Sequence, residues 1–151
     1  MNHVALATSS IGIAATLLKG GNTVHSTFKV PTNVERKVHP VCSIPKESQL
    51  AAVIRICKLI IWDECTISHK VAFEAVDRTL KDIMNQSYHS NPAIFGGIPI
   101  LVCGDFRQTI PIVPGGSIAD EINASFKRSN LWTSYNVTTF RLKTNMRAII
   151  R

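Results

Sequence analysis

The chain has 151 residues, of which 45% are hydrophobic and 18% are charged, a composition that excludes a disordered or low-complexity protein. At about 100 to 200 residues per domain, this length allows one compact unit or a piece of one. Seventeen Lys and Arg against ten Asp and Glu give a net charge of +7, so we expect a polyanionic partner, with nucleic acid favoured over a membrane surface.

Short apolar runs alternate with longer amphipathic stretches, a pattern typical of a parallel sheet with helices packed on its faces. The first half of the chain predicts a buried strand at residues 4–8 and a short helix at residues 11–18, which ends at the Gly20-Gly21 pair. A second helix is expected at residues 48–57, and it runs into an apolar strand at residues 59–62. The side chains expected on the buried face of that helix are Leu50, Val53, Ile54 and Cys57.

The second half predicts an amphipathic helix at residues 70–84, because apolar side chains recur there at helical spacing. The polar residues 85–97, which include Pro and Gly, predict a surface loop, and residues 98–103 predict a third apolar strand. Ser117, with Asp120 three residues later, resembles a capping box that starts a short helix reaching Ala124. Residues 137–142 predict a last strand.

Location and cysteine chemistry are also indicated by the sequence. No apolar run approaches the roughly 20 residues that span a bilayer, and the first residues lack the pattern of a signal peptide, so we expect an intracellular protein without membrane contact. The cysteines form neither a Cys-x-x-Cys pair nor a zinc-finger spacing, which predicts four reduced, mostly buried thiols. They are Cys42, Cys57, Cys65 and Cys103.

Charge is distributed unevenly along the chain. From Lys127 to the end there are six basic residues and no acidic one, whereas five of the ten acids lie between Asp63 and Asp82. The basic tail fits a solvated surface and a phosphate-facing surface equally well, and composition does not decide between them.

Two predicted strands end in acidic residues. Asp63 and Glu64 follow residues 59–62, and Asp105 follows Gly104 after the third strand. Ligands of open parallel sheets bind beside the carboxyl ends of the strands, so we expect the three carboxylates to meet at the rim of one crevice. One carboxylate beside a substrate phosphate is enough to hold Mg²⁺, and Glu64 would orient or deprotonate an attacking water. The alternative for a single acid of this kind is an ordinary surface position after a strand.

Apolar residues followed by Asp-Glu form the Walker B pattern of nucleotide hydrolases. In chain order, the segments GGNTVHSTFKVP, LIIWDE, ILVCGDFRQTIPIVPGGS and LKTNMR closely resemble the Pif-type (petite integration frequency) DNA helicases of the RecD-like branch of superfamily one. They are most similar to the helicase segment of Helitron-type mobile elements. The resemblance extends from Val4 to Arg147. It implies an α/β fold, a RecA-like P-loop NTPase core with a mostly parallel sheet flanked by helices, of which residues 1–151 form part of the first motor domain, with motifs Ia to IV.

The resemblance implies a role for several single residues. Asp63 matches the Walker B aspartate that helps to hold Mg²⁺, and Glu64 matches the glutamate that activates the hydrolytic water. Gln108 matches the motif III glutamine that senses the γ-phosphate of ATP, and Arg147 resembles the motif IV arginine that approaches the same phosphate. Phosphoryl transfer depends mainly on positioning and charge stabilisation, which these side chains suit.

Residues 23–28 resemble the motif Ia region, which in this family contacts single-stranded DNA. Thr23 and Ser26 suit contacts with phosphate, and His25 or Phe28 would stack on a base or sugar. For His25 taken alone, a purely structural role is slightly favoured. The small polar residue expected directly before Gly12 is replaced by Ile11, so Ser10 is our candidate for that contact with the DNA backbone.

The sequence also departs from the family pattern. It contains no G-x-x-x-x-G-K-[ST] phosphate loop, so we expect the Walker A segment to precede this chain and the second RecA-like domain to follow it. The role of Arg107 stays open between a phosphate, DNA and an ion pair with Asp105.

These observations leave three hypotheses. The first, implied by the resemblance, is part of an ATP-dependent helicase that moves 5′ to 3′ on single-stranded DNA and unwinds duplex junctions in the nucleus, with family roles in DNA repair, recombination and telomere maintenance. On this view the fragment alone is inactive. The second is a non-catalytic remnant of a mobile-element helicase with at most weak nucleic-acid binding, since the phosphate loop is missing. The third is a stand-alone metal hydrolase built on Asp63, Glu64 and Asp105.

Overall fold

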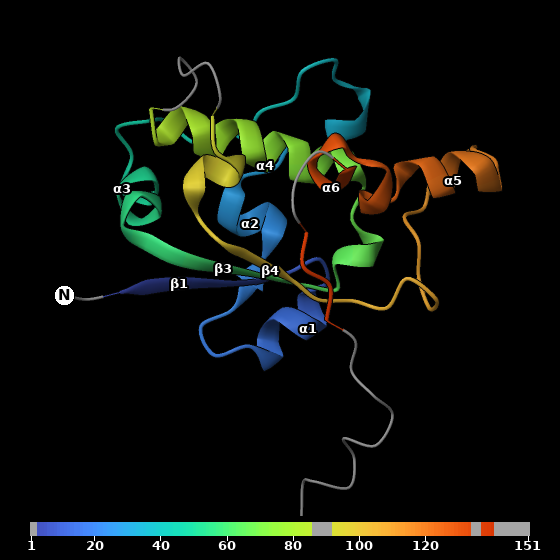
Figure 1. The fold of residues 1–151 in the computed structure, drawn as a ribbon, viewed down its shortest axis with the longest axis horizontal. Coiled ribbons are helices and arrows are strands. Elements are labelled where there is room, and N and C mark those ends of the chain that lie inside the picture. The colour runs from blue at the N-terminus through green and yellow to red at the C-terminus, as the bar shows by residue number, and fades with distance from the viewer. Residues whose placement is uncertain (1–2, 86–91, 134–136, 141–151) are drawn as a thin grey trace, which may run out of the picture.

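The computed structural model describes residues 3–85, 92–133 and 137–140 of the chain. Its centre is a four-stranded sheet in the order β2-β1-β3-β4, and every neighbouring pair of strands is parallel, as predicted (Figure 1). The strands are β1 (Val4–Ser9), β2 (Asn22–Thr23), β3 (Cys57–Asp63) and β4 (Ile100–Val102). Ser9 is paired with Asp63, and Trp62 with Val102, so the carboxyl ends of the three longer strands lie at the same edge of the sheet.

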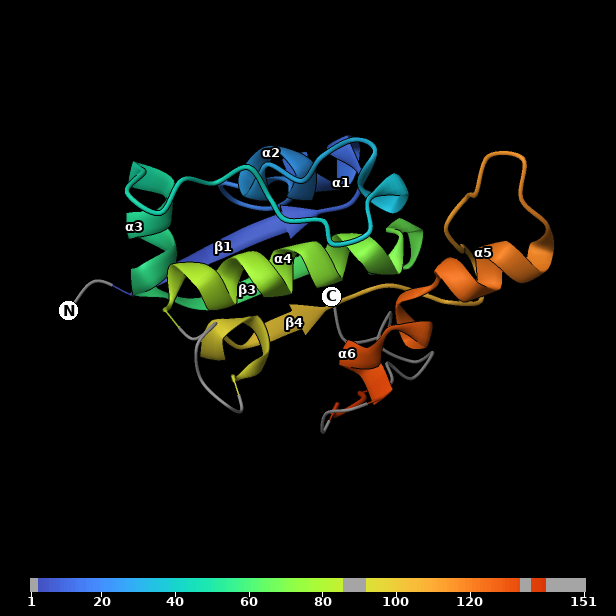
Figure 2. The same ribbon diagram turned by 90° about the horizontal axis from the view of Figure 1, so that it is seen from above.

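Helices cover the two faces of the sheet unequally. They are α1 (Gly12–Leu17), α2 (Val24–Phe28), α3 (Gln49–Ile56), α4 (Lys70–Ile83), α5 (Ile118–Ala124) and α6 (Asn130–Thr133). Figures 1 and 2 show α2, α3 and α4 on one face and α1 on the other, with α5 and α6 beyond the carboxyl ends of the strands. Within the described ranges, no helix is long and apolar enough to cross a membrane.

Polar side chains fix the starts of two predicted helices. The Ser48 hydroxyl accepts a hydrogen bond from the Ala51 N–H at 3.2 Å and begins α3. At α5, the Ser117 hydroxyl accepts from the Asp120 N–H at 3.3 Å, and the Asp120 carboxylate accepts from the Ser117 N–H at 2.7 Å. The predicted capping box is therefore confirmed, and it satisfies backbone donors that the first turn of a helix leaves without partners.

A stack of aromatic rings forms the centre of the core between the sheet and α4. The ring of Phe73 lies between Trp62 of β3 and Phe126, with ring centroids 3.9 Å and 4.0 Å away. Phe28 extends the stack, its centroid 6.5 Å from that of Trp62. Because these rings come from α2, β3, α4 and the short 3₁₀ turn at Phe126–Arg128, the stack joins segments far apart in the sequence.

The predicted buried face of α3 is partly wrong. Ile54 and Cys57 are buried as expected, but Val53 is 36% exposed, and Ala51 is fully buried in its place. A small side chain lets a helix approach its neighbours closely, a preference that the spacing of large apolar residues does not reveal.

Two predicted strands differ in the structure. The third strand is shorter than expected, because β4 covers only Ile100–Val102 and a 3₁₀ turn, Ile94–Gly97, precedes it. The last predicted strand is wrong over residues 137–140, which form no strand and are exposed, whereas residues 141–142 lie outside the described residues. A strand needs a neighbour to take up its backbone hydrogen bonds, and no strand is paired with this segment.

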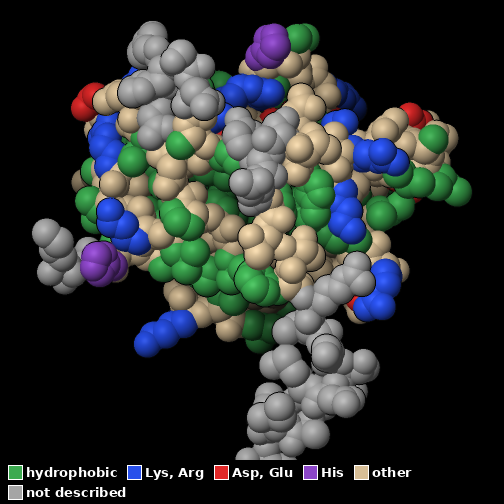
Figure 3. Space-filling model, in the orientation of Figure 1, with side chains coloured by type: hydrophobic (Ala, Val, Ile, Leu, Met, Phe, Trp, Pro, Cys, Tyr) green, Lys and Arg blue, Asp and Glu red, His purple; other side chains and the backbone are tan. Residues whose placement is uncertain are grey.

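The sheet face on the side of α1 is only partly covered. Leu101 of β4 is 48% exposed, and Ile13 and Leu17 of α1 are 78% and 82% exposed. Figure 3, in the orientation of Figure 1, shows hydrophobic side chains gathered at the level of the strands. Parallel sheets normally have both faces covered, so in the described residues this face is the incomplete side of the fold.

Candidate functional site

The candidate site lies at the carboxyl end of β3. Asp63 is the last residue of this strand, and its carbonyl oxygen accepts a hydrogen bond from the Ser10 N–H at 3.0 Å, which joins the ends of β3 and β1. Glu64 follows directly, and both residues are half-buried. The structure therefore places the two adjacent predicted acids together at the rim of the sheet.

Glu64 has a backbone conformation that L-residues rarely adopt. Its φ of 49° and ψ of 41° lie in the left-handed region, where it precedes a 3₁₀ turn, Cys65–Ile67. A side chain in this region costs about 1–2 kcal/mol, which glycine would avoid. Lys29, Asn85 and Phe95 also have a positive φ, so this conformation alone assigns no role to the Glu64 carboxylate.

The loop after β4 is attached to the turn that follows Glu64. The Cys65 N–H donates to the Cys103 carbonyl at 2.8 Å, and the hydroxyls of Thr66 and Thr109 are 2.6 Å apart. Gly104 lies at the closest approach, because a Cβ there would be 2.9 Å from a methyl carbon of Thr66. These contacts fix the two loops relative to each other.

Sequence reasoning missed the role of Thr66 and Thr109. Thr66 lies shortly after Asp63-Glu64 and Thr109 shortly after Asp105, and only these positions in the sequence indicate that the two side chains lie near the site. Their hydrogen bond is one of the contacts that hold the loop bearing Gln108 against the turn after Glu64.

Asp105 forms an ion pair with Arg107 and is not part of a metal-ligand cluster with Asp63 and Glu64 in the described residues. Both carboxylate oxygens accept hydrogen bonds from the Arg107 side chain, at 3.2 Å each, and Oδ1 also accepts from the Arg107 N–H at 2.9 Å. These side-chain hydrogen bonds hold the pKa of Asp105 below its usual value. Of the three roles left open for Arg107, the structure shows the ion pair with Asp105.

The carboxyl ends of β3 and β4 lie at the same edge of the sheet, as expected, but the three carboxylates do not form a metal-binding cluster in the described residues. No three His, Cys, Asp or Glu side chains in the described ranges are grouped as metal ligands. Within the described ranges, the structure thus gives no support to a stand-alone metal hydrolase built on Asp63, Glu64 and Asp105. The Asp63 carboxylate still has the hard oxygen donors that Mg²⁺ prefers, and a metal held there would take its other ligands from water and a bound phosphate.

Gln108 lies on the exposed turn that begins at Asp105. Its N–H donates to the Asp105 carbonyl at 3.0 Å, which keeps the turn closed while the Gln108 side chain stays exposed. The position suits a side chain that contacts a ligand at the carboxyl ends of the strands. Arg147, the second predicted phosphate contact, lies outside the described residues.

Thiol chemistry is not favoured beside the carboxylates. Burial, with smaller contributions from the nearby Cys103 and Asp63, raises the pKa of the Cys65 thiol to about 12. Burial also raises the pKa of Cys103. Three of the four cysteines are buried and Cys103 is half-buried, in agreement with the expected burial.

Ser10 has partners inside the protein. Its hydroxyl oxygen accepts a hydrogen bond from the Trp62 indole N–H at 3.0 Å and lies 2.8 Å from the Ser68 hydroxyl. The half-buried Ser10 thus helps to hold the aromatic residue directly before Asp63. A contact of Ser10 with DNA stays a prediction.

Of the residues around α2 that were predicted to contact DNA, some have exposed side chains and one is buried. Thr23 caps this helix, its hydroxyl accepting from the Ser26 N–H at 3.2 Å, and the side chains of His25 and Ser26 are exposed. Phe28 is fully buried in the aromatic stack, so the expectation that it stacks on a base is wrong for this structure. Helical spacing explains the difference, because Val24 and Phe28 lie one turn apart on the buried face.

Comparison with known proteins points to one family. The sequence profile of the PIF1-like helicase family matches residues 1–151. The ATP-dependent DNA helicase PIF4 of Trypanosoma brucei brucei is 31% identical over 103 residues, which are 67% of this chain and 12% of that protein. The chain spans 12 to 16% of the length of the curated relatives it matches.

Solved structures of Pif1 helicases share the fold. The Pif1 helicase from Candida albicans matches with a TM-score of 0.60 and 24% identity, covering 85% of this chain and 27% of that one. Bacteroides Pif1 in complex with ADP-AlF₃ and single-stranded DNA matches with a TM-score of 0.56 and 24% identity, covering 72% and 24%. The predicted RecA-like α/β fold is therefore confirmed, with a parallel four-stranded sheet and flanking helices.

Proposed function

Because the chain belongs to the PIF1-like helicase family, we propose that it forms part of a motor that hydrolyses Mg²⁺-ATP and moves 5′ to 3′ along single-stranded DNA. The observation that carries this proposal is the Asp63-Glu64 pair at the carboxyl end of β3, beside the loop that bears Gln108. Bacteroides Pif1, which shares the fold, has been solved with a nucleotide and single-stranded DNA.

In this proposal each acid has a separate task. Asp63 would hold Mg²⁺, which would supply positive charge next to the phosphates of ATP. Glu64 orients the attacking water and accepts its proton, and Gln108 contacts the γ-phosphate. The Thr66–Thr109 hydrogen bond supports the proposal, because it would transmit a movement of the Gln108 turn to the turn after Glu64. Arg147 would add a second cation at the γ-phosphate.

The remaining parts of the ATP site are proposed to come from segments outside these 151 residues. The chain has no Gly-rich phosphate loop, and backbone N–H groups of such a loop normally surround the phosphates. The partly covered sheet face, with Leu101 48% exposed, supports the packing of further chain against this side.

DNA binding is assigned to the exposed side of α2, where His25 and Ser26 lie. We expect the 151-residue chain to bind labelled oligothymidylate, with an affinity that falls steeply between about 50 mM and about 200 mM salt. His25→Ala should weaken binding about tenfold, because base stacking contributes about 1–3 kcal/mol. Fluorescence anisotropy measures both effects.

His39→Ala is the matched control, since His39 is also exposed but lies on a different segment. Equal losses for the two variants, or an affinity insensitive to salt, would count against a DNA contact at α2.

On the family resemblance, the proposal extends to duplex junctions as DNA substrates. It also extends to DNA repair, recombination and telomere maintenance as processes, and to the nucleus as location.

A further inference from the structure

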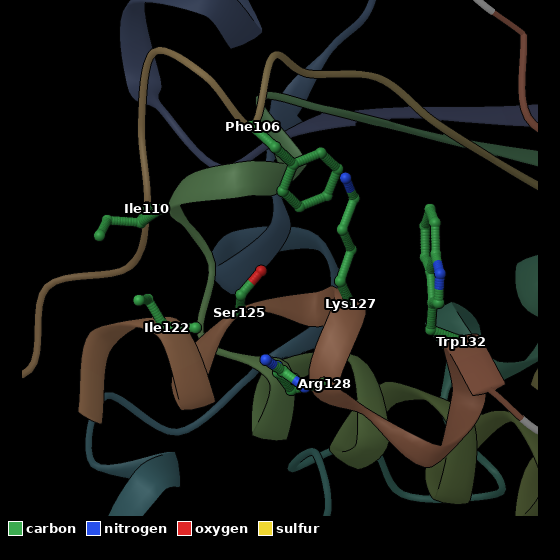
Figure 4. A pocket seen from close by; sticks show the side chains of 7 residues that line it. All are labelled: Phe106, Ile110, Ile122, Ser125, Lys127, Arg128 and Trp132. Carbon is green, nitrogen blue, oxygen red and sulfur yellow. The ribbon is translucent and has the colours of Figure 1, made fainter. Parts of the chain in front are cut away.

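A groove of about 480 Å³ lies between the loop after β4 and the segment of α5 and α6 (Figure 4). Its two ends differ in chemistry. Ile110 and Ile122 lie at one end, whereas Phe106, Lys127 and Trp132 lie at the other. None of these residues was assigned a role by the sequence motifs or by the ATP site.

The aromatic end of the groove holds a fixed positive charge. The Lys127 ammonium lies 4.2 Å from the centroid of the Phe106 ring and 5.9 Å from that of Trp132. Attraction to the two ring systems keeps the ammonium at the groove and restrains its flexible stem. Arg128, the next residue, adds a second cation to the lining.

This positive charge is not compensated within the described part of the chain. The groove is lined by no acidic side chain among the described residues, and neither Lys127 nor Arg128 forms a salt bridge there. In Figure 3, Lys and Arg side chains stand among hydrophobic ones in the region of α5 and α6. The groove is therefore complementary to a ligand with negative charge.

The aliphatic end of the groove, formed by Ile110 and Ile122, is complementary to an apolar side chain of a ligand. Ile110 and Ile122 are 37% and 44% exposed, and Ile112 and Ile118 of the same segment are 79% and 73% exposed. Ile118 and Ile122 are four residues apart on α5, so they lie on one side of this helix. Large aliphatic side chains concentrated on one exposed segment are typical of a protein-binding surface.

We propose that this groove binds a short acidic segment of a partner protein. An aliphatic or aromatic anchor of the segment packs against Ile110 and Ile122, and its carboxylates meet Lys127 and Arg128. The volume suits one anchor with its neighbours, at the scale of a peptide or small-ligand site. Single-stranded nucleic acid fits less well, because Lys127 already occupies a face of the Phe106 ring and the aliphatic end matches neither phosphate nor sugar.

The test uses the 151-residue chain and a short labelled peptide of aspartates with two leucines. Two further probes are the same peptide with asparagine in place of aspartate, and labelled oligothymidylate. We expect the aspartate peptide to bind and to change the fluorescence of Trp132, since the other tryptophan, Trp62, is fully buried. The asparagine peptide should bind at least about tenfold more weakly.

Three variants locate the binding. The double variant Lys127→Gln/Arg128→Gln and the variant Ile122→Ser should each lower the affinity for the aspartate peptide at least about tenfold. Lys37→Gln, which removes an exposed cation from another segment, should leave it unchanged.

Three results would overturn the proposal. They are equal binding of the asparagine peptide, no binding of the aspartate peptide, and oligothymidylate binding that the Lys127→Gln/Arg128→Gln change abolishes while the peptide does not bind. None of these measurements involves ATP hydrolysis, so their failure would leave the helicase proposal standing.

Discussion

Glu64→Gln is expected to lower DNA-stimulated ATP hydrolysis by about 100-fold to 10,000-fold, the usual contribution of a general base. The test requires a protein that carries this chain together with the remaining segments of a PIF1-like helicase. Glutamine keeps the size and shape of the side chain at the end of β3, but its amide cannot accept the proton of the attacking water. Phosphate release at saturating ATP and single-stranded DNA measures kcat, and ATP binding should be unchanged.

Glu64→Gly separates this loss from a loss of folding. Since Glu64 has a φ of 49°, glycine should raise the free energy of unfolding by about 1 kcal/mol, as measured by urea titration of the 151-residue chain. The same change should abolish ATP hydrolysis in the joined protein, which is this chain together with the remaining segments of a PIF1-like helicase. Normal turnover in Glu64→Gln would refute the assigned role. Absence of turnover in the unmodified joined protein would favour the remnant hypothesis.

Phe73→Ala should destabilise the chain by about 3–5 kcal/mol, the usual cost of deleting a buried aromatic ring. Phe73 is fully buried, and its ring lies between those of Trp62 and Phe126, so its loss leaves a cavity between β3 and α4. This is a large part of the roughly 5–15 kcal/mol by which native proteins are stable. Urea unfolding followed by tryptophan fluorescence gives the free energy.

Phe140→Ala is the control for the same deletion at an exposed site. Phe140 is 83% exposed, so its removal should change the free energy of unfolding by less than about 0.5 kcal/mol. Similar values for the two variants would show that the aromatic stack does not hold the core together.

Local signals predicted the parts of the fold that depend on neighbouring residues. The order of β1, α1, α3, β3, α4, β4 and α5, the capping box at Ser117, and the position of Asp63 and Glu64 at a strand end follow from periodicity and from polar residues at element boundaries. The short elements β2, α2 and α6 were not predicted. These features are set within a few residues, where steric and hydrogen-bonding preferences act directly.

Features that depend on distant contacts were not predicted. Phe28 is buried because Trp62, 34 positions later in the numbering, offers it a ring to pack against, and the Thr66–Thr109 hydrogen bond joins two loops. The ion pair of Asp105 with Arg107 is a local contact, and it was one of the three roles that the sequence left open for Arg107. Composition and spacing do not rank such competing partners, because the outcome depends on three-dimensional distances.

The assignment of Asp63 and Glu64 as hydrolytic residues of a DNA motor is tested most directly by strand displacement. The joined protein and its Glu64→Gln variant are compared on duplexes with a 5′ or a 3′ single-stranded tail. The unmodified protein should release the strand from the 5′-tailed duplex only when ATP is present, and the variant should bind this duplex without releasing the strand. ATP-dependent release by both proteins would contradict the assignment, and release from the 3′-tailed duplex alone would contradict the proposed 5′ to 3′ direction.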